Sequence, residues 1–205
     1  MSDGNYELPT AGRDPGDRAP APGSLRLVQA LVNTLNREFG PDLLATPDAA
    51  AGWLATAGLW TAGPGRAPLS SAPLSQAQQG VLTELREACR GVLWAHTERR
   101  PDPVAAARLA TALGSCRLTL SAGPGGDLRL DCADHDPFTR AVGAVATAIA
   151  EASVAGTWDR LKSCPGHLCG WAFYDRSPAG RSRWCSMQVC GSREKMRAYR
   201  GRPPA

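Results

Sequence analysis

Four cysteines in the last quarter of the chain are the residues whose type and spacing point most directly to chemistry. Cys164 and Cys169 form one pair, Cys185 and Cys190 form a second, and four residues separate the members of each pair. Zinc prefers four thiolate or imidazole ligands in a tetrahedron, and two tight chain turns can supply two thiolates each. Ordinary buried thiols are the alternative, because free cysteine packs like a small hydrophobic residue. The paired spacing favours one zinc ion held by all four cysteines.

A shell of four thiolates leaves no open position for water or substrate, so the metal is expected to be structural rather than catalytic. His167 lies inside the first pair, and we interpret it as a loop residue and not as a ligand. Asn33, His96 and the run Asp134-His135-Asp136 are the other polar candidates, and packing or capping explains each of them. The sequence contains no recognisable nucleophile and base pairing, Gly-rich phosphate loop or carboxylate pair. An enzymatic activity is therefore not expected.

Basic side chains concentrate in the region of the four cysteines. Residues 156–205 carry 10 Lys/Arg against 3 Asp/Glu, whereas residues 1–155 carry 13 against 16. A basic end on a mildly acidic body suits an anionic partner such as DNA. Arginine also outnumbers lysine by 21 to 2, a bias typical of GC-rich bacterial genomes.

The segment after the second cysteine pair is the predicted DNA-contacting element. Ser192 is placed to cap a helix through about Tyr199, with Met196 and Tyr199 on the side expected to pack. Arginine can contact phosphates and can also bind guanine through two hydrogen bonds, although a solvated basic face is the alternative. The predicted nucleic-acid contacts are Arg181, Arg183, Arg193, Lys195, Arg197 and Arg200.

Apolar residues at three- and four-residue intervals, together with capping residues, predict the helices that surround these sites. The expected helices cover about residues 24–38, 47–57, 75–96, 103–113 and 136–154. Alternating residues on either side of a Gly-rich turn predict a β-hairpin over 118–132. Within the cysteine region a strand over 171–176 is expected to turn at 177–180 and return through 181–184. The fold class is mainly α with a β-hairpin, followed by a small zinc finger with the treble-clef-like order of knuckle, hairpin, knuckle and helix.

The residues around the second cysteine pair resemble the CGNR zinc-finger family. The match lies in Trp184-Cys185-Ser186-Met187 and Cys190-Gly191-Ser192-Arg193, and Ser192 stands where the family signature has asparagine. Both residues cap helices well, so the fold is expected to tolerate the change. Val32-Asn33-Thr34 and Trp53-Leu54 are similar to the ABATE domain that accompanies this finger. The resemblance covers about residues 25–200 and implies a bacterial, often stress-associated transcription regulator with zinc on the four cysteines.

The expected organisation has four parts. They are a disordered tail at 1–23, a helical ABATE-like domain with its hairpin at 24–155, a CGNR-type zinc finger at 156–201 and a short tail at 202–205. No apolar run is long enough to cross a membrane and the first residues lack the apolar core of a signal peptide, so a cytoplasmic protein without a membrane partner is expected.

Two functions are compatible with this organisation. In the first, the finger contacts DNA while the helical domain dimerises or senses a small-molecule effector. In the second, the finger is purely structural and the protein binds a small molecule or another protein. Redox sensing is a third possibility, because oxidation of the four zinc thiolates would release the metal and unfold the finger. Cys116 and Cys132 could face each other across the hairpin, but we interpret them as packed thiols.

Overall fold

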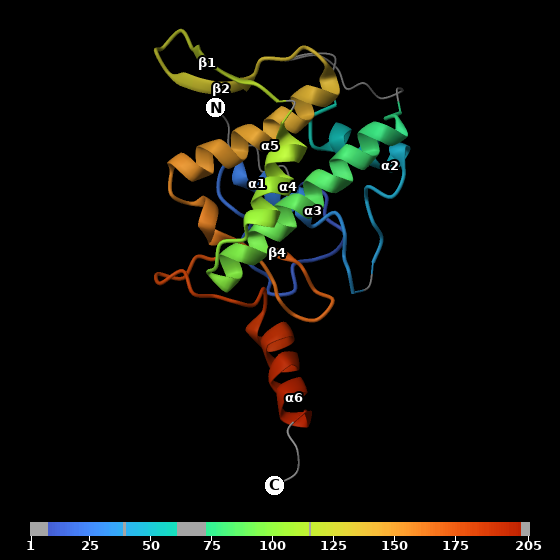
Figure 1. The fold of residues 1–205 in the computed structure, drawn as a ribbon, viewed down its shortest axis with the longest axis vertical. Helices are drawn as coiled ribbons and strands as arrows, with labels where there is room; N and C mark the ends of the chain where they lie inside the picture. Colours follow the sequence, from blue (N-terminus) through green and yellow to red (C-terminus); the bar gives the residue numbers. More distant parts are fainter. Residues whose placement is uncertain (1–7, 39, 61–72, 115, 202–205) are drawn as a thin grey trace.

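Every helix of the body except the first begins where the sequence supplies a side-chain cap. Before the first helix, the Ser24 hydroxyl donates to the Glu151 carboxylate at 2.6 Å and does not cap. In the computed structural model, which describes residues 8–38, 40–60, 73–114 and 116–201, the helices pack into a helical body with the cysteine region below it (Figure 1). Ser75 and Gln78 form a capping box, and Asp102 and Asp136 each cap a helix that starts with proline. The helices of the body are α1 Leu25–Val32, α2 Pro47–Thr56, α3 Gln76–Glu98, α4 Pro103–Leu113 and α5 Pro137–Val154.

The first helix is shorter than the sequence predicts, because it ends at Val32 and not near residue 38. The carbonyl oxygen of Asn33 accepts a hydrogen bond from the Ala11 amide at 2.8 Å, and that of Thr34 accepts from the Leu43 amide at 2.9 Å. These acceptors are therefore not available to a further helical turn. Phe39, which the predicted apolar stripe included, lies outside the described residues.

The predicted hairpin is confirmed. Strand β1 (Leu118–Ala122) pairs antiparallel with β2 (Leu128–Cys132), with Leu118 opposite Cys132. The hairpin lies beside α5, at the end of the molecule opposite the cysteine region (Figure 1).

The strand pairing predicted for the cysteine region is wrong. Strand β4 (Ala172–Tyr174) pairs antiparallel with β3 (Leu161–Ser163), which precedes the first cysteine, and not with residues 181–184. The backbone ladder continues past β3, because the Cys164 amide donates to the Trp171 carbonyl at 2.9 Å. The first cysteine turn is thus the loop of the hairpin.

The last helix, α6 (Ser192–Arg200), continues directly from a π-helical turn over Met187–Gly191. Ser186 caps this turn by accepting from the Val189 amide at 3.2 Å, so the predicted capping role of Ser192 is wrong. Ser192 already has helical backbone angles, and its hydroxyl donates to the Met187 carbonyl instead. Helix α6 projects away from the rest of the molecule (Figure 1).

The helical body and the cysteine region share one hydrophobic core. Leu161, Ala172 and Tyr174 of the small hairpin belong to the same buried cluster as α1, α3 and α5. Phe173, on the opposite face of β4, packs with the four cysteines and Trp171 in a second cluster. One strand therefore joins the two cores through its alternating faces.

Residues 8–23 run along both parts of the molecule, although the sequence predicts a disordered tail there. The Trp53 indole donates to the Pro9 carbonyl at 2.9 Å, and Arg18 donates to the Trp184 carbonyl at 3.0 Å. Arg18 also lies over the Phe173 ring at 4.9 Å. The segment contains few large apolar residues, and its contacts are mostly polar, so apolar content does not reveal them.

Among the described residues, no helix is long and apolar enough to cross a membrane.

Candidate metal centre and its attachment to the helical body

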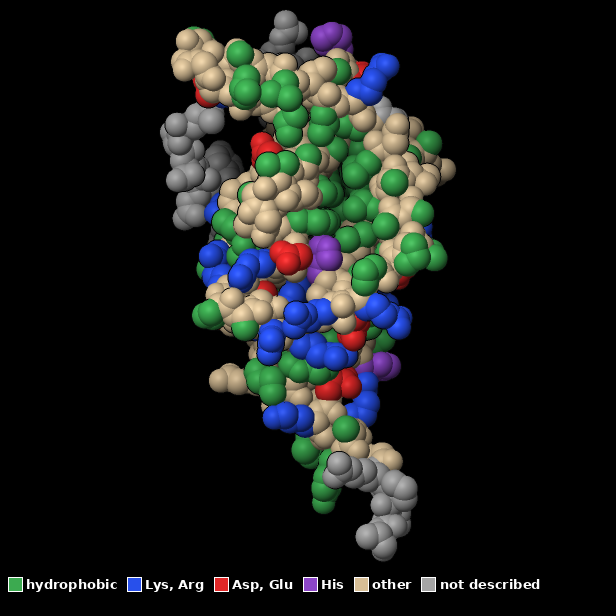
Figure 2. Space-filling model, turned by 60° about the vertical axis from the view of Figure 1, so that its left-hand side comes forward, with side chains coloured by type: hydrophobic (Ala, Val, Ile, Leu, Met, Phe, Trp, Pro, Cys, Tyr) green, Lys and Arg blue, Asp and Glu red, His purple; other side chains and the backbone are tan. Residues whose placement is uncertain are grey.

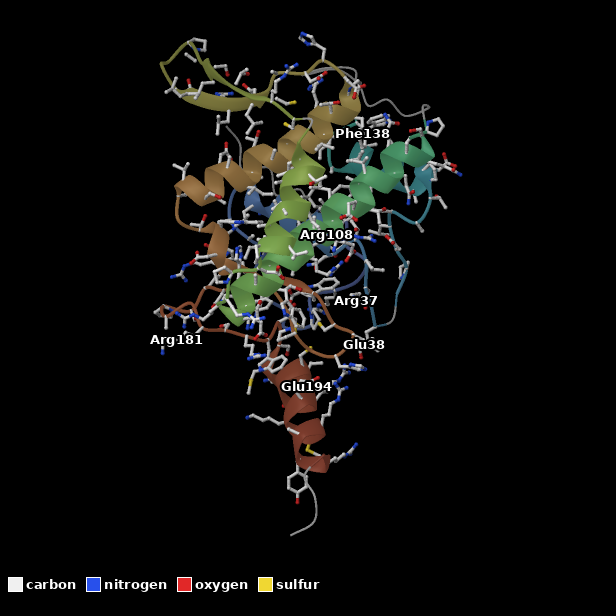
Figure 3. All side chains as sticks on the ribbon, in the orientation of Figure 1. Arg37, Glu38, Arg108, Phe138, Arg181 and Glu194 are labelled. Atoms are coloured by element: carbon white, nitrogen blue, oxygen red, sulfur yellow. The ribbon has the colours of Figure 1, made fainter. Side chains whose placement is uncertain are left out.

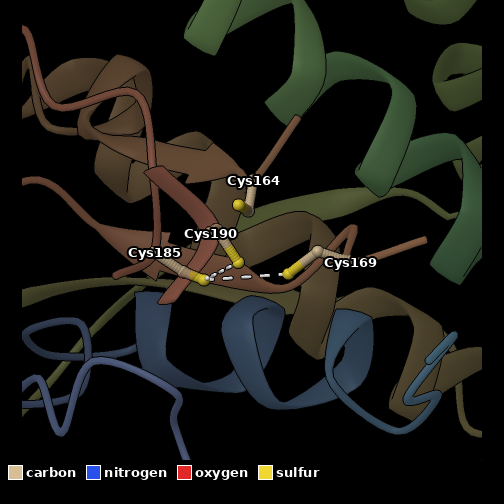
Figure 4. Close-up of side chains that lie close together, drawn as sticks. All are labelled: Cys164, Cys169, Cys185 and Cys190. Atoms are coloured by element: carbon tan, nitrogen blue, oxygen red, sulfur yellow. Dashed lines mark hydrogen bonds between the residues drawn. The ribbon is translucent and has the colours of Figure 1, made fainter. Parts of the chain in front are cut away.

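The four cysteine sulfurs converge on one point from two chain turns (Figure 4). All four residues are buried, and their Sγ atoms lie within 4.8 Å of one another. The Cys169–Cys185 and Cys185–Cys190 sulfurs are 3.7 and 3.6 Å apart. A zinc ion with Zn–S distances of about 2.3 Å requires S–S distances of about 3.8 Å in a regular tetrahedron. Cys164, Cys169, Cys185 and Cys190 therefore fit one structural zinc ion.

Different backbone devices form the two turns. In the first, the Cys169 amide donates to the Gly166 carbonyl at 2.9 Å, and Leu168 and Gly170 both have positive φ. In the second, the Gly191 amide donates to the Ser186 carbonyl at 3.1 Å, which is the wide spacing of a π turn. This wider turn carries Cys190, so the metal site fixes the start of α6.

The electrostatics of the cluster call for a cation. Thiol hydrogen bonds, first of all from Cys169, lower the pKa of Cys164, so one thiolate is well stabilised. The bonds that Cys169 and Cys185 make to Cys164 raise the pKa of these two thiols. Four adjacent thiolates repel one another unless a metal ion neutralises them, and a divalent cation with an affinity for sulfur does so.

His167 is exposed, and its backbone amide donates to the Glu194 carboxylate at 3.1 Å. Glu194 lies on α6, so this hydrogen bond links the first cysteine turn to the helix that follows the second (Figure 3). The contact was not predicted, because a single glutamate in a basic helix gives no sign of its partner.

Asn33 attaches the finger to the helical body. Its side-chain nitrogen donates to the Ala172 carbonyl at 2.9 Å, and its side-chain oxygen accepts from the Ala172 amide at 2.7 Å. The side-chain amide thus pairs with β4 much as a neighbouring strand would. Asn33 is 2% exposed, so both hydrogen bonds are shielded from water. Asn33 therefore has a packing role and not a catalytic one, as predicted from the sequence.

Helix α3 supplies further contacts along the same seam. Arg90 is buried, donates to the Gly170 and Val32 carbonyls and pairs with Glu87 at 3.0 Å. Two turns further on, Thr97 donates to the Ser163 carbonyl at 2.7 Å. These bonds hold the carbonyl groups of the first cysteine turn and of β3, and the Gly170 carbonyl also accepts from the Ser163 hydroxyl at 3.2 Å.

A buried ion pair fixes the loop that leads from β4 to the second cysteine pair. Lys162 and Asp175 are 2.8 Å apart, and their side chains are 3% and 0% exposed. Burial alone would disfavour the Asp175 carboxylate, but hydrogen bonds from Lys162, Ser177 and Ser182 hold its pKa well below its usual range. Lys162 also donates to the Gly180 and Ser182 carbonyls at 2.7 and 3.1 Å.

The residues predicted to contact DNA differ in their surroundings. Arg193 pairs with Glu38 of the helical body, Arg197 with Glu194 at 3.1 Å, and Arg183 with Glu98 at 2.8 Å. The other three are exposed and form no ion pair with any residue that the structure describes; they are Arg181, Lys195 and Arg200.

Met196 and Tyr199 do not pack as predicted. They are 52% and 72% exposed, because α6 projects away from the body and has no neighbouring helix to cover them. No residue of α6 is buried.

The remaining polar candidates have structural partners. His96 bonds through Nδ1 to the Leu161 carbonyl at 2.9 Å. Asp136 accepts from the Thr139 amide at 2.8 Å, and Asp134 accepts from the Asp136 amide at 2.9 Å, so the interpretation of this run as a turn and cap is confirmed. The sulfurs of Cys116 and Cys132 are 3.8 Å apart, so these two thiols do face each other at the hairpin.

Sequence reasoning missed Arg86, Arg90 and Lys162, which are all buried. A signal for the two arginines does exist in the sequence. They lie four residues apart on the apolar stripe of α3, where a cation requires an oxygen partner. Arg86 finds that partner in Asp42, to which it donates twice.

Comparison with known families agrees with this architecture. A family model for the CGNR zinc finger matches residues 160–203. A model for the ABATE domain, described as a "putative stress-induced transcription regulator", matches residues 25–156. A search of curated proteins finds no similar sequence. The ABATE model covers more than half of the chain, and the two domains follow each other in the order expected from the sequence. The chain therefore belongs to the ABATE family and carries a CGNR zinc finger after the ABATE domain.

Proposed function

We propose that this protein is a cytoplasmic transcription regulator that binds DNA through α6, while the ABATE domain holds the finger in place and dimerises or senses an effector. The observation that carries the proposal is the exposure of α6. The helix starts at a zinc ligand, projects from the body and buries none of its side chains. The helix carries one acidic residue, Glu194, and four basic ones, which are Arg193, Lys195, Arg197 and Arg200.

The attachment of the finger supports this proposal. Asn33, Arg90 and Thr97 hold the finger through buried hydrogen bonds to Ala172, Gly170 and Ser163, which supports one orientation of the finger and of α6 relative to the body. A helix that is already oriented loses less entropy on binding than one on a flexible linker. Two copies joined through their ABATE domains would then present two α6 helices at a fixed separation.

Charge reversal on α6 tests the proposal. Lys195→Glu and Arg200→Glu change exposed residues with no ion pair in the described structure, so folding should survive. Arg117→Glu is the matched control, because Arg117 is also exposed and forms no ion pair with a described residue, and it lies just before β1, away from α6. Binding to duplex DNA is measured by fluorescence anisotropy over a series of salt concentrations.

The α6 variants should bind more weakly than the control at every salt concentration. Each lost phosphate contact should also reduce the slope of log K against log salt by about 0.9. Equal losses of affinity in Lys195→Glu, Arg200→Glu and Arg117→Glu would show that only net charge matters and would overturn the role of α6.

A second function is favoured by the apolar residues on α6 and the turn before it. Met187, Met196 and Tyr199 are at least half exposed, and a helix that only contacts phosphates has no use for them. They would suit a protein partner, with the finger as a structural module. Replacing Met196 and Tyr199 by serine distinguishes the two functions, since it should spare phosphate contacts and weaken a protein interface.

A further inference from the structure

A second site lies where the end of α3 and the start of α4 meet the finger. The cleft there has a volume of about 800 Å³, within the range of small-molecule sites. Both domains line it: Val92, His96 and Ala106 come from the helical body, and Arg160 and Gly180 from the finger segment. Ligand sites often lie at the interface between two domains. A ligand in such a site contacts both domains and so links them.

The cleft combines an apolar wall with a cationic rim. Arg99 and Arg100 line it, and neither forms an ion pair with any residue in the described ranges. Asp102 and Asp159 also line it, but the Asp102 carboxylate accepts hydrogen bonds from the Val104 and Ala105 amides at the start of α4. On this face, Lys and Arg side chains gather across the middle of the molecule, below an apolar surface (Figure 2).

Arg99 occupies a backbone position that favours glycine. It is the C-cap of α3 and has left-handed angles, with φ of 54° and ψ of 34°. This conformation costs a non-glycine residue about 1 kcal/mol. A glycine would remove that cost, but it would also remove a cation from the rim of the cleft.

His96 adds a hydrogen-bond acceptor. Its Nδ1 faces the Leu161 carbonyl, which can only accept, so Nδ1 carries the proton. Burial lowers the pKa of His96, so the ring is neutral at pH 7 and Nε2 is an acceptor. Nε2 has no hydrogen-bond partner among the described residues.

We infer that this cleft binds a small organic anion that combines an apolar body, an acidic group for Arg99 and Arg100, and a hydroxyl for Nε2 of His96. An aromatic hydroxycarboxylate has all three features. The site would be the effector site of the regulator: Gly180, at its edge, precedes Arg181 in the loop held by the Lys162–Asp175 pair. This regulatory role rests on the proposed function, whereas the binding itself does not.

Binding is tested with the purified zinc-loaded protein and no DNA. The fluorescent probe is 8-anilinonaphthalene-1-sulfonate, and the competitors are 4-hydroxybenzoate and its neutral counterpart 4-hydroxybenzamide, whose hydroxyl groups cannot bond to their own acid or amide group. The hydroxybenzoate should displace the probe at a concentration at least fivefold lower than the amide, because only the anion forms charge-assisted hydrogen bonds with the arginines.

Two variants locate the site. Arg99→Gly relieves the backbone cost, so it should melt at the wild-type temperature or above while binding hydroxybenzoate about fivefold more weakly. Ala106→Trp should fill the cleft and abolish displacement. The matched control is Arg108→Ala, on α4 and outside the lining of the cleft, which should bind as the wild type does.

Equal displacement by acid and amide, or wild-type affinity in both Arg99→Gly and Ala106→Trp, would overturn the inference. Since DNA is absent, either result leaves the role of α6 untouched. Conversely, loss of DNA binding in the α6 variants does not bear on this cleft.

Discussion

At the scale of single residues, Asn33 joins the helical body to the finger through its hydrogen bonds to Ala172. Asn33→Ala leaves the Ala172 amide buried without a partner, while the Ala172 carbonyl keeps only the hydrogen bond from Gln29 at 3.2 Å. One unsatisfied buried group costs about 1–3 kcal/mol, so we expect the free energy of unfolding to fall by about that much. Urea denaturation measures the change. Thr56→Ala, which removes an exposed hydroxyl on α2, is the control and should stay within about 0.5 kcal/mol of the wild type. Equal stabilities for the two variants would contradict the role of Asn33.

Cys116 gives a prediction about reactivity. Burial, followed by its contact with Cys132, raises the pKa of Cys116 to about 11. Only the thiolate is alkylated, so labelling by iodoacetamide at pH 8 should be on the order of 100-fold slower than for a free thiol, and should rise about tenfold per pH unit. Mass spectrometry of the labelled peptide, with glutathione as the reference thiol, gives the rate. A rate at pH 8 equal to that of glutathione would show an accessible thiolate and rule out this environment.

At the scale of elements, the loop over 175–182 depends on one buried charge pair. Lys162→Met removes the cation and leaves the Asp175 carboxylate buried, which should cost about 3–5 kcal/mol. The double variant Lys162→Met with Asp175→Asn should lose less stability than the single one, because it buries no unpaired charge and the side-chain oxygen that remains at position 175 can still accept from a serine amide. Chemical denaturation of both variants, with zinc present, makes the comparison. A double variant that is less stable than Lys162→Met would mean that the pair itself, and not its charge balance, holds the loop.

Local signals explain which elements the sequence reveals. Helices α3, α4 and α5 were predicted within a few residues, because Ser75, Asp102 and Asp136 cap them and their apolar residues repeat over several turns. The strands of the finger are three residues long, which is too short for a periodic pattern, so their pairing was predicted wrongly. Ser186 and Ser192 are both suitable caps, and only the π turn that Cys190 occupies decides between them.

The candidate site divides in the same way. The four zinc ligands could be predicted from spacing alone, since a metal site in two chain turns is a local feature of the sequence. The residues that attach this site to the body could not, because Asn33, Arg90 and Lys162 act through backbone carbonyl and amide groups distant in the sequence. Any residue type can supply a backbone carbonyl or amide, so a partner of this kind leaves no recognisable pattern in the sequence.

At the scale of the whole molecule, the shared core makes the finger and the ABATE domain dependent on each other. Leu161, Ala172 and Tyr174 fill the main core, but the cysteine turn between β3 and β4 holds them in place. Metal binding stabilises such a turn directly. Removing zinc should therefore withdraw buried apolar side chains from the helical body as well, and the two domains should unfold in one transition.

Chelation tests this dependence. Burial of Leu161 and Tyr174 is worth about 1.5–3 kcal/mol each, and a chain of this size loses about 2–4 °C per kcal/mol, so excess EDTA should lower the melting temperature by roughly 6–24 °C. Calorimetry should show one peak that moves, and hydrogen exchange should accelerate in α3, which contains no zinc ligand. Zinc-saturated EDTA is the control and should have no effect. If α3 kept its protection after chelation while only residues 161–191 exchanged faster, the finger would be an independent unit, and a fixed orientation of α6 would lose its structural basis.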